Sequence, residues 1–107
     1  MNAYPEIADA ELVAEIDEHL VDRDGLHYVA RIYGCPRSDG AWVGWLEFVA
    51  IGEHRRRRTD VETTQATRLH LFEWASRIEP TYLEGAFARA SSNAARVAHA
   101  ELRHPTP

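Results

Sequence analysis

The pattern of hydrophobic positions predicts a strand most clearly along residues 41–51, where nearly every residue is apolar. The two sets of alternating positions are Trp42, Gly44, Leu46, Phe48 and Ala50 on one face and Val43, Trp45, Glu47, Val49 and Ile51 on the other. A period of two predicts a β-strand. Apolar residues on both faces are typical of a central strand or of a strand at an interface.

An alternating run over residues 26–33 comes earlier in the chain and is followed by a glycine-containing loop over 34–40. Residues 22–25 read Asp-Arg-Asp-Gly, which favours a tight turn because glycine readily adopts a positive φ angle. Residues 19–21, ahead of this turn, are extended in character. We therefore expect a hairpin in which one strand precedes the turn and a second follows it.

The beginning of the chain has a different spacing. Asp9 is a suitable helix N-cap. Apolar residues recur three or four positions apart at Leu12, Val13, Ile16 and Leu20. This spacing predicts a short N-terminal helix at about residues 9–16.

The second half of the chain is predicted to be mainly helical. Residues 55–62 are polar and extended in character, so they are expected to form at most a weak edge strand. Thr63 or Thr64 can cap a helix over residues 65–78, where the apolar positions cover a wide arc. Pro80 stands at the favoured first position of a second helix, in which apolar residues recur at three- and four-residue steps.

These elements predict one α+β domain over residues 1–104, with a frayed tail at 105–107. We expect two layers: an antiparallel sheet of three or four strands, two C-terminal helices on one face and the short N-terminal helix.

The second face of the sheet then needs another cover. The candidate interface residues on that face are Val43, Trp45, Val49 and Ile51. An exposed apolar patch of this kind is most commonly buried by two-fold pairing, so a homodimer is expected. The N-terminal helix is the alternative cover.

The composition, with 45% hydrophobic and 27% charged residues in a chain of 107, fits one globular domain. The residues after Met1 lack the pattern of a secretion signal, and no run is long enough to span a membrane. The single cysteine, Cys35, allows no internal disulfide. We therefore expect a cytoplasmic protein that does not contact a membrane.

Charge is distributed unevenly along the chain. All 12 basic residues are arginine, which excludes chemistry that requires a lysine. Residues 1–54 carry a net charge of −8 and residues 55–107 a net charge of +3. This asymmetry suits head-to-tail or self-complementary contact between copies, although it also fits a solvated acidic segment.

The most conspicuous motif is the run Arg55, Arg56, Arg57 and Arg58. Guanidinium groups bind phosphate well, so one hypothesis is a regulator that associates with nucleic acid. In a strand the four side chains would alternate faces, and the pI near 5.6 differs from the basic footprint of nucleic-acid modules. A solvated edge strand, partly paired with the acidic half of the chain, is the favoured interpretation.

Glu47 lies inside an apolar strand and therefore needs a partner. We expect an arginine from the second half of the chain; without one, the pKa of Glu47 would rise and it could act as a general acid or base. The candidate ligand cleft consists of Glu47, Glu62, Gln65 and Tyr82. No nucleophile motif, nucleotide loop or metal-ligand spacing occurs, so no catalytic residue, metal or cofactor is assigned.

Three runs resemble a family of small bacterial proteins of uncharacterised function. They are Gly-Trp-Leu-Glu-Phe at 44–48, Thr-Asp-Val-Glu-Thr-Thr-Gln at 59–65, and the segment from Trp74 to Ala86. The resemblance covers about residues 5–90 and implies a stand-alone cytoplasmic bacterial domain without implying an activity. We therefore expect an interaction or assembly module that forms a homo-oligomer. The alternatives are a small-ligand-binding protein or enzyme, and a regulator associated with nucleic acid.

Overall fold

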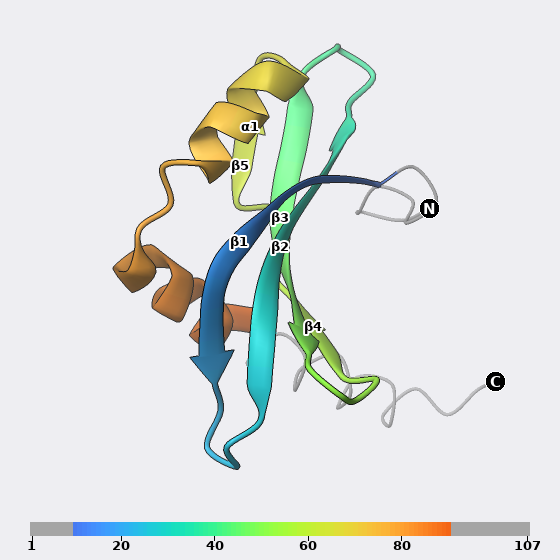
Figure 1. Ribbon diagram of the computed structural model, residues 1–107. Helices are drawn as coiled ribbons and strands as arrows, with labels where there is room; N and C mark the ends of the chain where they lie inside the picture. The colour runs from blue at the N-terminus through green and yellow to red at the C-terminus, as the bar shows by residue number, and fades with distance from the viewer. Residues whose placement is uncertain (1–9, 91–107) are drawn as a thin grey trace, which may run out of the picture.

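A computed structural model describes residues 10–90 and shows an antiparallel sheet with two helices on one side (Figure 1). The labelled elements are β1 Glu11–Val21, β2 His27–Pro36, β3 Trp42–Ala50, β4 Arg56–Arg58, β5 Thr63–Gln65 and α1 Arg68–Ala75. A second helix begins at residue 80 and continues to residue 90, where the described region ends. The α+β class and the two C-terminal helices are therefore confirmed. The tail at 105–107 lies outside the described residues.

The strands follow the order β1-β2-β3-β4, and β5 also pairs with β3. Every pairing is antiparallel. Because β2 occupies one edge of β3, β4 and β5 must share its other edge, one near each end. They are two halves of a single fourth strand, interrupted by residues 59–62.

The interruption is anchored to β3 by Thr59. Its amide donates to the carbonyl of Leu46 (2.9 Å), and its Oγ1 accepts from the amide of Leu46 (3.0 Å). The same hydroxyl donates to the carbonyl of Asp60 (2.8 Å). At the far end of the loop, the amide of Glu62 donates to the carbonyl of Gly44 (2.8 Å). The loop therefore has a fixed place beside the sheet, and so does Glu62.

The predicted N-terminal helix is wrong for the residues that the structure describes, because 11–16 belong to the long strand β1. Two register shifts interrupt its pairing with β2. They change the spacing of the core-facing residues, so that Val13, Ile16 and Leu20 stand three and four positions apart. Bulges in a strand have thus imitated the period of a helix. Asp9 lies outside the described residues.

Helix α1 begins later than expected. Thr63 and Thr64 pair with β3 as part of β5, and the N-cap is Thr67, whose Oγ1 accepts from the amide of His70 (3.0 Å). The helix ends at Ala75 rather than near residue 78.

The core lies between the sheet and the helices. It comprises Val13 and Leu20 of β1, Tyr28, Ala30 and Ile32 of β2, Leu46, Phe48 and Ala50 of β3, and Leu71, Ala75, Leu83, Ala86 and Ala90 of the helices. Helix α1 approaches the sheet closely at the paired glycines Gly34 and Gly44. A Cβ atom at Gly44 would lie 2.6 Å from Cδ1 of Leu71, so only glycine leaves room for this leucine.

Candidate functional site

The face of the sheet opposite the helices carries charged and aromatic side chains. Because residues along a strand alternate between faces, the neighbours of the core residues on β2 and β3 point to this side. We call it the charged face, and define it by Glu15, Val29, Arg31, Tyr33, Trp45, Glu47, Val49, Arg56 and Arg58. The described helices lie on the other side of the sheet (Figure 1).

Four alternating charges cross all four strands of the charged face in one row. Glu15 of β1 pairs in register with Arg31 of β2, Arg31 with Glu47 of β3, and Glu47 with Arg58 of β4. The first two form an ion pair of 2.8 Å between Arg31 Nε and Glu15 Oε2. We call these four residues the charge row. Its signs run minus, plus, minus, plus from β1 to β4.

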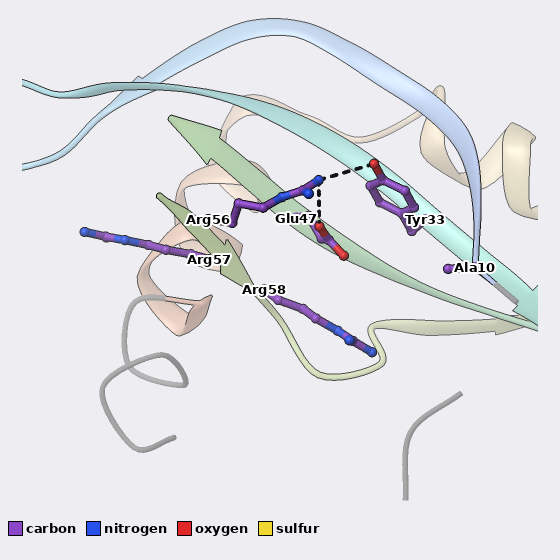
Figure 2. Close-up of a pocket in the computed structure, with 6 residues that line it drawn as sticks. All are labelled: Ala10, Tyr33, Glu47, Arg56, Arg57 and Arg58. Carbon is purple, nitrogen blue, oxygen red and sulfur yellow. Dashed lines mark hydrogen bonds and ion pairs between the residues drawn. The ribbon is translucent and has the colours of Figure 1, made fainter. Parts of the chain in front are cut away.

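Glu47 has the partner that the sequence led us to expect. Its Oε1 lies 3.1 Å from Nη2 of Arg56, an arginine from the second half of the chain, and its side chain is only 14% exposed. Its Oε2 accepts a hydrogen bond from Nε1 of Trp45 (3.4 Å). Arg56 also donates to the hydroxyl of Tyr33 (3.4 Å). Figure 2 shows Glu47, Tyr33 and Arg56 converging on one another.

These groups line a pocket of about 380 Å³ on the charged face (Figure 2). Its lining consists of Ala10, Tyr33, Glu47, Arg56, Arg57 and Arg58. The guanidinium of Arg58 stacks over the ring of Trp45, 4.6 Å from the ring centroid. The pocket therefore combines a carboxylate, a phenol hydroxyl and guanidinium groups within one hollow.

The arginine run alternates faces, as expected for a strand. Arg56 and Arg58 lie on the charged face, whereas Arg57 packs over the core ring of Tyr28, 5.0 Å from its centroid. Arg57 also pairs with Asp22 (3.5 Å), and Arg55 with Glu53 (3.6 Å). The expected pairing with the acidic half of the chain is thus present, but Arg57 is less solvated than expected, with a side chain that is 19% exposed.

A second polar cluster ties the loop after β4 to the C-terminal helix. The hydroxyl of Tyr82 donates to Oε1 of Glu62, and Nη2 of Arg89 lies 2.6 Å from the same oxygen. Burial, as the larger cause, and the hydrogen bond to Glu62 together raise the pKa of Tyr82 to about 12. All three side chains satisfy one another, so this cluster fixes the helix on the loop.

The four residues of the candidate cleft do not share one site. Glu62 and Tyr82 are in contact, but Glu47 lies on the opposite face of the sheet, and Gln65 donates to Thr63 Oγ1 in its own strand (2.6 Å). The sequence prediction does not include Arg89, which stands two helical turns after Tyr82 and therefore lies on the same side of the helix.

The candidate interface is also divided. Trp45 is 1% exposed and Val43 7% exposed, and both belong to a small buried cluster with Cys35. Val49 is half-buried and Ile51 is exposed. The apolar patch expected on this face therefore does not include Val43 and Trp45, because the chain itself buries them.

Within residues 10–90, no group of three or more His, Cys, Asp or Glu side chains is arranged to hold a metal ion. The helices of that region are too short or too polar to cross a membrane. No protein-family model, curated protein or solved structure matches the chain, and the family resemblance of the three sequence runs stays a prediction.

Proposed function

We propose that this domain is an assembly module that self-associates through the charged face of its sheet. The observation that carries the proposal is the charge row, which crosses all four strands on the face that the described helices leave uncovered. Alternating charge across a surface gives an interface its specificity and orientation.

Apolar side chains on both sides of the charge row supply contact surface. Val29 and Val49 are paired in register and half-buried, and Leu12, which pairs with Tyr33, is exposed. Interfaces are typically enriched in aromatic residues and arginine, and both occur here. Trp45, although buried, forms the floor beneath Arg58.

The face is close to the size that a specific contact needs. Four strands about 4.8 Å apart and about nine residues long outline roughly 570 Å² per copy, part of which, at Val43 and Trp45, the chain already buries. Two such faces bury at most roughly 1,100 Å², near the size of about 1,000 Å² where specific interfaces begin. The expected association is therefore weak to moderate, at micromolar concentration.

Light scattering on a sizing column tests the proposal. The native chain is expected to show a mass that rises above the 12.2 kDa of one chain as concentration increases. Val49→Asp should return it to one chain, whereas Leu69→Asp, on the exposed side of α1, should have no effect. A mass of one chain at every concentration would overturn the proposal.

A second candidate function, the binding of a small ligand, is favoured by the pocket around Glu47. Its volume of about 380 Å³ is within the usual range for ligand sites. The acceptor oxygens of Glu47 and the donors of Arg56 and Tyr33 would suit a molecule that carries both positive and negative groups.

This candidate is tested by thermal shift measurements with a panel of zwitterionic metabolites. Glu47→Gln should abolish any shift, while Glu53→Gln, in the exposed turn after β3, should preserve it. Because Glu47 belongs to both the pocket and the charge row, a bound ligand should also compete with self-association.

A further inference from the structure

We infer that the two copies are related by a two-fold axis that runs along the strands, between β2 and β3, in the plane between the facing sheets. This inference rests on the proposed self-association through the charged face. Rotation about such an axis reverses the order of the charge row. Glu15 then faces Arg58 of the partner subunit, and Arg31 faces Glu47 of the partner subunit.

The signs of the charge row select this axis. A row of four alternating charges is complementary to its own reversed copy, so every charge faces an opposite one. A two-fold axis that runs along the row instead leaves the order of the charges unchanged. Glu15 would then face Glu15 of the partner subunit, and each of the other charges would also face its like.

The apolar rows agree with the same axis. Rotation about an axis along the strands leaves each residue at the same position along the strand direction. The row that contains Val29 and Val49 therefore faces the same row of the partner subunit, in reverse order. Val29 then packs against Val49 of the partner subunit. Rotation about the charge row would instead place Val29 opposite Tyr33 of the partner subunit and Val49 opposite Trp45 of the partner subunit, and Trp45 is only 1% exposed. The strand-parallel axis therefore matches both the charged and the apolar rows.

The side chains can span the gap between the sheets. Facing sheets lie about 10 Å apart, a distance that a glutamate and an arginine cover when they extend from opposite sides. Glu15 is 55% exposed and Arg31 32%, so both can reach a partner while their own ion pair is kept. Glu47 is 14% exposed and keeps its pair with Arg56, so Arg31 of the partner subunit must extend to meet it. Twisted sheets pack at about −30°, which places the axis within roughly 15° of the strands.

Charge reversal at the two ends of the row tests the inference. Glu15→Arg and Arg58→Glu should each raise the dissociation constant of the dimer about tenfold or more, because each creates like-charge contacts at both ends. An equimolar mixture of the two variants should restore association close to that of the native chain. Sedimentation velocity measures all four samples. In the mixture, each variant chain still has the unfavourable contact that its substitution creates within the chain. Restored association can therefore come only from contacts between chains.

Glu18→Arg is the matched control, since it makes the same change at an exposed position of β1 outside the row. It should leave the dissociation constant unchanged. If circular dichroism shows that Arg58→Glu does not fold, the double variant Glu15→Arg with Arg31→Glu replaces it. This variant keeps an ion pair inside the chain but should still weaken the dimer.

The outcomes separate the two proposals. A native chain that never dimerises overturns the proposed function. A native dimer that Val49→Asp disrupts, but that neither charge reversal nor the double variant weakens, retains the charged face and overturns the axis.

Discussion

The hydroxyl of Thr59 takes the place of a main-chain carbonyl where the fourth strand is interrupted. Leu46 of β3 needs an acceptor for its amide at this point, and Thr59 Oγ1 supplies it at 3.0 Å. The hydroxyl proton goes to the carbonyl of Asp60 (2.8 Å), so the group is satisfied in both directions. The side chain is 2% exposed, which keeps water from serving as a substitute.

Thr59→Val keeps the shape of this side chain and removes its acceptor. The buried amide of Leu46 then has no partner, so the free energy of unfolding should fall by about 1–3 kcal/mol. Thr64→Val, at an exposed position of β5, should change it by less than about 0.5 kcal/mol. Urea denaturation compares the two, and equal effects would contradict the assigned role of the hydroxyl.

Tyr82 should titrate apart from the other tyrosines. Burial and the hydrogen bond to Glu62 raise its pKa to about 12, above its ordinary value of 10.0. Because the folded state keeps this proton when the unfolded state loses it, the stabilising contribution is complete below pH 10 and is lost as pH rises towards 12. The absorbance of tyrosinate at 295 nm should therefore include a component near pH 12.

Tyr82→Phe should remove that component and flatten the fall in stability above pH 10. Tyr33→Phe, which lies on the charged face, is the control and should leave the component near pH 12 in place. A component that persists in Tyr82→Phe would show that another group carries it.

At the scale of elements, the sequence predicts the hairpin strands because the alternation of residues between the two faces of a strand is visible in adjacent positions. Strand β1 was misjudged because its bulges depend on the pairing with β2, which the spacing of apolar residues does not reveal. The start of α1 was misplaced for a similar reason. Thr63 and Thr64 have the chemistry of N-caps, but the free edge of β3 takes them as a strand.

The close approach of α1 to the sheet depends on Gly34. A Cβ atom there would overlap the side chain of Leu71 and lie 2.9 Å from the carbonyl oxygen of Val43. Because the carbonyl belongs to the backbone of β3, it cannot move aside as a side chain can. Gly34→Ala should lower the free energy of unfolding by about 1–3 kcal/mol through overpacking.

Gly40→Ala is not a suitable control, since Gly40 has a positive φ angle. Gly85→Ala in the second helix is preferable, because its added Cβ meets only the tip of Arg89, at 3.4 Å. Thermal denaturation should show little loss for Gly85→Ala. A similar small loss for Gly34→Ala would mean that α1 is not held against the glycine pair.

At the scale of the whole molecule, the charge row could not be predicted from the sequence. Its members come from four strands, and only the combined register of three pairings places them in line. The pairing of Glu47 with an arginine was predictable, since a carboxylate in an apolar strand needs an opposite charge. The identity of that arginine depends on the tertiary fold. So does the position of Tyr82 on the other face of the sheet.

Asp22 links the hairpin turn to the far edge of the sheet and to the core. It accepts from the amide of Leu26 (3.0 Å) and the hydroxyl of Tyr28 (3.2 Å), and it pairs with Arg57. The amide of Leu26 is the largest of the influences that lower the pKa of Asp22 below its ordinary value of 3.8. Its stabilising contribution is therefore complete above that pH and is lost as pH falls further.

Asp22→Asn should lower the stability of the domain at pH 6, and the difference from the native chain should shrink as pH falls below 3.8. Guanidinium denaturation across this range measures both chains. Asp24→Asn, in the same turn, is the control and should track the native curve. A constant difference between Asp22→Asn and the native chain would mean that the carboxylate charge is not what stabilises the turn.

The irregular pairing of β1 has a consequence for solubility. An edge strand of 11 residues with a regular outer edge would invite another molecule to add a strand, and then another, into a growing fibre. The two register shifts and the acidic residues Glu11, Glu15, Asp17 and Glu18 make that edge a poor template. In the proposed dimer, contact between molecules is through the face of the sheet instead, and a two-fold pairing of faces closes after two copies and cannot propagate.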